Sequence, residues 1–178
     1  MREDQLLASH RKGNPHGPKA HDGKITFFAV DHCSMECVGI HVAKRGIRFE
    51  ALEPIRQGMR EYFGAFGKDV AAELSLRHDH GSQYVSDVFQ EEVRFLGDRV
   101  PSCLCAGTLK GMDVLKQFVR IIKENLLWVK TFETVEEVRV ALQEFRRIYN
   151  ETWIVGRHAY KTPAQIRREQ RYLAIEAA

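Results

Sequence analysis

The chain has 178 residues and a formal net charge of +3, and 44% of its residues are hydrophobic and 29% are charged. This composition is typical of a globular protein and excludes an intrinsically disordered one. No apolar run approaches the roughly 20 residues that span a bilayer, and the opening MREDQLLASHRKGN lacks the apolar core of a signal peptide. We therefore expect one domain with a sizeable core, a cytoplasmic location and no membrane partner.

Residues 1–24 are polar and rich in Gly, Pro and His, which predicts an irregular arm or linker. ITFFAVDH (25–32) and ECVGIHVA (36–43) are two β-rich runs separated by a short polar stretch, a pattern that predicts a hairpin. Apolar residues then recur at helical spacing from Phe49 to Phe63. Pro54 is tolerated in such a helix near its start.

Four cysteines occur as two close pairs, Cys33/Cys37 and Cys103/Cys105. Thiols of a cytoplasmic chain are expected to be reduced. His32, Cys33 and Cys37 suggest a zinc site, but the sequence has no second cysteine pair at zinc-finger spacing. We therefore assign no metal to the cysteines.

The second half of the chain is mostly helical in pattern. The apolar residues of 73–77 predict a short strand, which leads to Asp79 at its end. Helical spacing of apolar residues predicts three further helices, over 85–96, 115–126 and 134–149. Gly97 is a stop for the first of them, and Thr134 with Glu137 forms a capping box for the last. The order of strands and helices indicates an α/β fold with a mixed sheet.

Five stretches carry a family resemblance in combination: RHDHGSQY, AVDHCSMECVGIHVA, IIKENLLWV, FRRIYNETW and KTPAQIRREQ. Together they resemble the integrase-core transposases of bacterial insertion sequences, relatives of retroviral integrase in the ribonuclease-H-like superfamily. The resemblance covers about residues 10–173 with two interruptions. It implies a five-stranded mixed sheet flanked by helices. The expected domains are a polar arm over 1–24, an integrase core over 25–155 and a basic C-terminal segment over 156–178.

The resemblance also implies a chemistry, in which three carboxylates (Asp, Asp, Glu) hold two Mg²⁺ or Mn²⁺ ions and DNA is cut and joined. Hard cations of this kind take oxygen ligands, and a pair of them stabilises both the attacking and the leaving oxygen of a phosphodiester displacement. Asp79 matches the second carboxylate, with Gly81, Ser82 and Gln83 following as the family pattern requires. On sequence alone, an aspartate that satisfies a polar turn is the alternative.

The other two carboxylates do not match. The first should stand on a central strand before the hairpin, yet AHDGKI runs almost directly into TFFAVDH, so we infer that this strand is deleted with its aspartate. Asp22 lies too early, and Asp31 matches a family position that is not the catalytic acid. The third carboxylate falls at Lys116, whose cation opposes metal binding. Glu124 lies about 12 Å further along the helix, too far to replace it.

A shifted reading frame accounts for the loss around Lys116. LKGMDVLK (109–116) can be encoded by bases that spell Glu-Gly-Asn-Gly-Cys-Ala-Glu when they are read from the third nucleotide. That run is the family pattern around the third carboxylate. The nucleotide sequence of this stretch tests the hypothesis directly.

The resemblance predicts a DNA transposition protein that is catalytically inactive because two of its three carboxylates are missing. Its partners would be the DNA ends of an insertion sequence, and a second copy or the full-length transposase. We expect four C-terminal cations to neutralise DNA phosphates, although a solubilising surface is the alternative; they are Arg157, Lys161, Arg167 and Arg168. A sheet without its central strand would leave unpaired backbone groups and marginal stability.

Two other functions stay open at this point. A non-enzymatic fragment could bind DNA or the transposase and interfere with transposition. An unrelated metal hydrolase could use His78, Asp79 and His80, although alternate residues of a strand face opposite sides, which separates the aspartate from both histidines.

Overall fold

The computed structural model describes residues 5–12, 24–72, 74–78, 81–97 and 113–176. Four strands in these ranges form one sheet in the order β3-β2-β1-β4, and the resemblance implied five. The strands are β1 (Gln5–Lys12), β2 (Ile25–Asp31), β3 (Cys37–Ala43) and β4 (Ser75–His78). β1 is antiparallel to β2 and parallel to β4, and β2 is antiparallel to β3. The predicted mixed sheet and the predicted hairpin are therefore confirmed.

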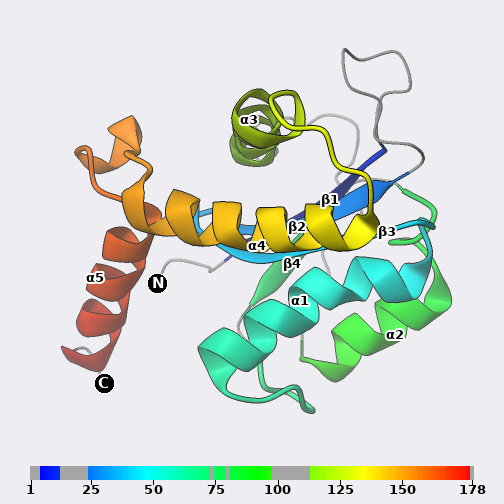
Figure 1. The fold of residues 1–178 in the computed structure, drawn as a ribbon. Coiled ribbons are helices and arrows are strands. Elements are labelled where there is room, and N and C mark those ends of the chain that lie inside the picture. The colour runs from blue at the N-terminus through cyan, green and yellow to red at the C-terminus, as the bar shows by residue number, and fades with distance from the viewer. Residues whose placement is uncertain (1–4, 13–23, 73, 79–80, 98–112, 177–178) are drawn as a thin grey trace.

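Helices cover both faces of the sheet (Figure 1). One face packs against α1 (Arg48–Phe63) and α2 (Asp87–Phe95), and the other against α3 (Asp113–Ile122), the π-helical turn η2 (Lys123–Leu127) and α4 (Val135–Thr152). Side chains of a strand point alternately to its two faces. Phe28 and Val30 of β2 accordingly join the cluster of α3 and α4, whereas Phe27 and Ala29 join that of α1 and α2. The result is a three-layer α/β/α core with β2 buried throughout.

β1 corrects the prediction that the sheet lacks its first central strand. Residues 5–12, which we expected to lie in an irregular arm, pair with both β2 and β4. Ala8 on this strand is 1% exposed. Without β1, the facing edges of β2 and β4 would leave backbone N–H and C=O groups unpaired inside the sheet. Because the backbones of β2 and β4 need partners, residues 5–12 form a strand even though residues 9–12 (SHRK) are polar.

The contact between β3 and α1 depends on a glycine. A Cβ built on Gly39 would lie 1.9 Å from the backbone oxygen of Pro54, which stands inside α1. Only a residue without a side chain lets the helix approach the strand this closely. α1 is thereby held against the hairpin along its buried side, which includes Leu52 and Ile55.

The chain after α4 forms a short 3₁₀ turn, η3 (Gly156–His158), and a final helix, α5 (Pro163–Glu176). Val155 and Lys161 close the loop between them as an isolated β-bridge. Ile166 of α5 is 6% exposed and belongs to the core cluster of α3 and α4. Across the described ranges, no helix has the length and the apolar character that crossing a membrane requires.

Candidate catalytic edge and basic C-terminal segment

The predicted catalytic residue Asp79 follows the last residue of β4. Asp79 and His80 lie outside the described residues, whereas His78 pairs with Ala8 in the parallel ladder between β4 and β1. β4 ends at this pair, whereas β1 continues to Lys12 beside β2. We call the end of β4, where it lies against β1, the candidate catalytic edge.

His78 is a buried packing residue. It is 4% exposed, and its ring stacks on Tyr84 with a centroid distance of 5.4 Å and meets the edge of Phe89 at 5.8 Å. Its Nε2 lies 3.3 Å from Nε2 of Gln90. An imidazole enclosed by α2 in this way is poorly placed to bind a metal at the edge of the sheet, which weighs against the metal-hydrolase hypothesis.

Two described positions bear on the other two carboxylates, and neither is acidic. On β1, Ala8 pairs with His78 and is followed by Ser9. On α3, Lys116 is largely exposed, and its Nζ lies 3.8 Å from Oδ1 of Asp113. Within the described ranges, no three His, Cys, Asp or Glu side chains are close enough to share a metal.

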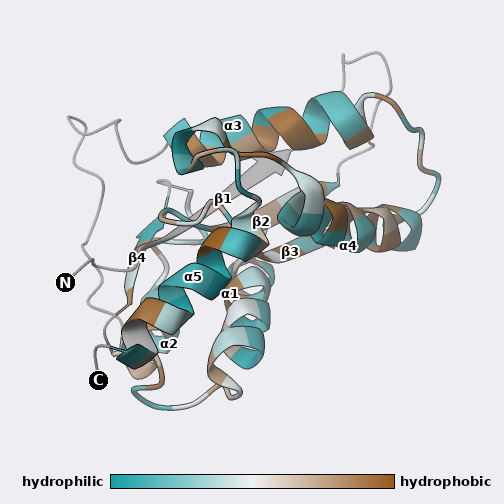
Figure 2. Ribbon diagram, turned by 90° about the vertical axis from the view of Figure 1, so that its left-hand side faces the viewer, coloured by the Kyte–Doolittle hydropathy of each residue, from teal (hydrophilic) through white to brown (hydrophobic). Residues whose placement is uncertain are grey.

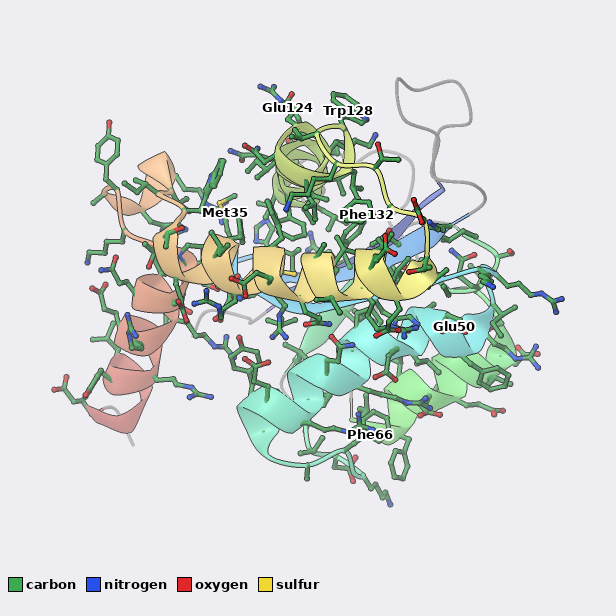
Figure 3. All side chains as sticks on the ribbon, in the orientation of Figure 1. Met35, Glu50, Phe66, Glu124, Trp128 and Phe132 are labelled. Atoms are coloured by element: carbon green, nitrogen blue, oxygen red, sulfur yellow. The ribbon has the colours of Figure 1, made fainter. Side chains whose placement is uncertain are left out.

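Glu124 does not compensate. It belongs to η2, and its carboxylate accepts a hydrogen bond from Nε of Arg120 at 3.0 Å. Figure 3 shows Glu124 on the outer side of the helical segment, away from the sheet. The prediction that Glu124 is a solvent-facing helix residue agrees with this position, since its side chain is 45% exposed.

Asp31 ends β2, which β1 separates from β4 in the sheet. It pairs with Leu6, at the start of β1, and holds the turn between β2 and β3 by accepting hydrogen bonds from the N–H groups of Cys33 (3.2 Å) and Ser34 (2.9 Å) and from the Ser34 hydroxyl. An Asp that caps its own turn in this way is a common structural device. Asp31 is thus a turn residue, a role that the sequence did not predict.

The hairpin turn also argues against zinc at its cysteines. Cys33 is half-buried and Cys37 is fully buried, and both are free thiols. Burial raises the pKa of the Cys37 thiol to about 12, which disfavours the thiolate that binds zinc. Cys103 and Cys105 lie outside the described residues.

Two of the predicted DNA-contacting cations, Arg157 and Lys161, hold the loop between α4 and α5 in place through hydrogen bonds. Nη2 of Arg157 donates to the backbone oxygens of His32 (2.5 Å) and Cys33 (3.2 Å), in the turn of the hairpin. Nζ of Lys161 lies 2.7 Å from both carboxylate oxygens of Glu169 on α5. Both side chains remain partly or fully at the surface.

The other two predicted contacts are neighbours on α5 with different surroundings. Arg167 is 18% exposed, with Nη1 3.6 Å from Oδ2 of Asp31 and its guanidinium over the ring of Tyr62 at 4.7 Å. Arg168 is exposed to solvent, on a helix whose outer surface is largely hydrophilic (Figure 2). The sequence gives no reason to distinguish Arg167 from Arg168. In the structure, Arg167 packs α5 against Asp31 and Tyr62, whereas Arg168 faces solvent.

A groove on the outer side of α3 and η2 was not predicted. Its volume is about 510 Å³, and it is lined by Lys116, Gln117, Arg120, Ile121, Glu124, Asn125 and Trp153. Trp153 comes from the end of α4, where its ring lies 6.0 Å from that of Tyr149. The groove combines two cations with an indole, although it joins segments too far apart in sequence for any local pattern to reveal it.

No family model matches this chain, and no curated protein matches its sequence.

Solved structures with a similar fold are integrase catalytic cores. The catalytic core domain of BIV integrase has a TM-score of 0.71 and 18% identity, over 98% of this chain and 99% of its own. The HTLV-2 integrase core in complex with magnesium has a TM-score of 0.63 and 14% identity, over 93% and 97%. A chain of the simian T-cell lymphotropic virus intasome in complex with PP2A subunit B56 gamma has a TM-score of 0.63 and 14% identity, over 93% and 54%. The chain therefore has the integrase catalytic-core, ribonuclease-H-like fold.

Proposed function

We propose that this chain is a DNA integration or transposition protein of the insertion-sequence type, in a copy that has lost catalysis. One observation carries the proposal: the integrase-core fold occurs together with RHDHGSQY, and this motif begins on β4 at the edge that β4 shares with β1. The fold supports a general class of DNA chemistry. The motif adds Asp79, the aspartate that this class of DNA chemistry requires, directly after β4 in the sequence.

The proposed inactivity rests on the residues around Asp79. The HTLV-2 core was solved with magnesium, in keeping with a family that uses Mg²⁺ or Mn²⁺. In this proposal Asp79 is the one ligand that matches the family pattern: Lys116 takes the third position by sequence, and Ser9 on β1 is our candidate for the first. A single carboxylate cannot neutralise two divalent cations.

Restoring the carboxylates tests this proposal. The double variant Ser9→Asp/Lys116→Glu should gain affinity for Mn²⁺ in calorimetric titration, whereas the wild-type chain should show none. A third substitution, Asp79→Asn, should abolish the gain. Nicking or strand transfer by the wild-type chain with Mg²⁺ or Mn²⁺, abolished by Asp79→Asn alone, would overturn the claim of inactivity.

A second candidate function is a fragment that binds DNA or a full-length transposase and interferes with transposition. The observation that favours it is that the three-layer core is complete although the carboxylate set is not. Lys116 and Arg168 also keep exposed cationic side chains. The simian neighbour is part of an intasome, which makes a second copy or a full-length transposase the expected protein partner.

Binding without cleavage distinguishes this candidate. Titration of insertion-sequence end DNA should show affinity that falls linearly with the logarithm of salt concentration, as counterion release requires. A shuffled duplex of the same length serves as the control for end recognition. If no salt-sensitive binding is observed, the DNA-binding candidate is wrong, and so is the proposal that the exposed cations Lys116 and Arg168 derive from a DNA-contacting surface.

A further inference from the structure

Tyr160 stands at the tip of the loop between α4 and α5. Its side chain is 78% exposed, more than any other large hydrophobic side chain in the described ranges. Ala159 and Tyr160 both have positive φ angles, of 52° and 62°. L-residues with side chains rarely adopt this left-handed conformation, and two in succession are found where the surroundings impose them.

The loop is held in shape from both sides. The N–H of Val155 donates to the oxygen of Lys161 at 3.0 Å, and the N–H of Lys161 donates to the oxygen of His158 at 3.2 Å. Arg157 anchors the same loop to the hairpin turn through the oxygens of His32 and Cys33. Tyr160 is therefore presented to solvent on a closed loop, so little conformational freedom remains to be lost when its ring meets a partner.

The charge of the segment that carries Tyr160 indicates an anionic partner. Residues 152–168 contain no Asp or Glu, whereas they contain four Arg and Lys residues. The next acid, Glu169, is neutralised by Lys161. Arg168 faces solvent. An exposed aromatic ring in a basic stretch is the arrangement that binds single-stranded nucleic acid, because the bases stack on the ring while cations hold the phosphates.

We propose that Tyr160 is a stacking site for an unpaired base of DNA, with Arg168 contacting the backbone beside it. This inference rests on the proposed DNA association and adds to it the form of DNA that is recognised. Ends that fray or are opened during recombination chemistry supply unpaired bases of this kind.

The test compares single-stranded and duplex oligonucleotides of equal length by fluorescence anisotropy. Tyr160→Ala should weaken single-strand binding about tenfold, the usual effect of losing one stacked base, and should weaken duplex binding less. Tyr160→Phe keeps the ring and should bind like the wild type. Tyr172→Ala is the matched control, because Tyr172 is 70% exposed on α5 and lies outside the loop.

A 2-aminopurine base in the single strand reports stacking directly. Its fluorescence should fall when the wild-type chain binds and should stay high with Tyr160→Ala. If the wild type binds DNA and Tyr160→Ala binds equally well with the same quenching, the stacking site is wrong while the DNA association stands. If the wild type binds neither oligonucleotide, both fail. If Tyr160→Ala changes only self-association in sedimentation, the ring is a protein contact and the proposal is overturned.

Discussion

Arg167 and Arg168 show how two neighbouring residues with the same charge acquire different roles. Arg167 touches Asp31 and Tyr62, whereas Arg168 faces solvent. We predict that Arg167→Met lowers the free energy of unfolding by about 2 kcal/mol, because it leaves a buried carboxylate without its cation. Arg168→Met should change it by less than about 0.5 kcal/mol. Urea unfolding measures both.

DNA titrations complete the comparison of the two arginines. Arg168→Met should weaken DNA binding and reduce the slope of log affinity against log salt by about 1, which is the loss of one phosphate contact. Arg167→Met, studied where it remains folded, should leave that slope unchanged. Equal effects of the two substitutions on stability and on the slope would contradict the distinction drawn from α5.

Glu36 is a buried acid beside the hairpin turn, 6% exposed. Burial raises the pKa of its carboxyl above the ordinary value of 4.5. The folded chain then holds this proton more tightly than the unfolded chain, so the free energy of unfolding falls as pH rises from about 4.5 through the raised pKa.

Glu36→Gln should therefore be more stable than the wild type at neutral pH and equally stable in acid, where Glu36 is itself neutral. Urea unfolding at the two pH values checks this, with Glu124→Gln on exposed η2 as the control that should show little pH-dependent change. A wild type more stable than Glu36→Gln at neutral pH would mean that the ionised carboxylate is well compensated by Arg167.

At the scale of elements, the packing of α1 on β3 makes a sharp prediction about Gly39. Gly39→Ala places a methyl group against the backbone oxygen of Pro54, which cannot rotate away. We expect a loss of about 3 kcal/mol or more, as for overpacked cores. Gly67→Ala is the matched control, because a Cβ there meets nothing within 4 Å. Similar melting temperatures for the two variants would contradict the observed approach of α1 to the sheet.

Elements with strong local patterns were predictable from the sequence. The hairpin follows from two β-rich runs, and α4 begins at its predicted cap, where the Thr134 hydroxyl accepts from the N–H of Glu137 at 3.1 Å. The Glu137 side chain accepts from the N–H of Glu133, one residue before the reciprocal bond of a full capping box. Local propensity and tertiary packing agree in these elements.

β1 was not predictable because its signal is not local. β1 is polar, and its partners β2 and β4 come later in the chain. In the same way, the sequence showed the charge of Arg167 but not the distant Asp31 that neutralises it, and it showed Asp79 but not which residues of other strands would stand beside it.

α5, in contrast, begins at a local signal that we did not use: the N–H of Thr162 donates to Gln165 Oε1 and the N–H of Gln165 donates to the Thr162 hydroxyl, with Pro163 as the first helical residue. α5 has few apolar residues and docks through Arg167.

For the whole molecule, the place of β1 between β2 and β4 makes residues 5–12 an integral part of the sheet. Deleting residues 1–12 should abolish the cooperative thermal transition, because β2 and β4 would each lose a strand partner. Adding a peptide of residues 1–12 should restore at least part of the transition. A truncated chain that melts as sharply as the intact one would show that the sheet closes without this strand.

The same strand also sets a condition on the order of folding. Gln5 pairs with Ser75, and Ala8 with His78, so the ladder joins residues that are far apart in sequence. Contacts of this kind slow folding, because a long loop has to close before they form. On the ribosome, the hairpin of β2 and β3 can assemble early, whereas one side of β1 waits until β4 has been synthesised. Of the four strands described, β1 is thus synthesised first and is among the last to complete its hydrogen bonds.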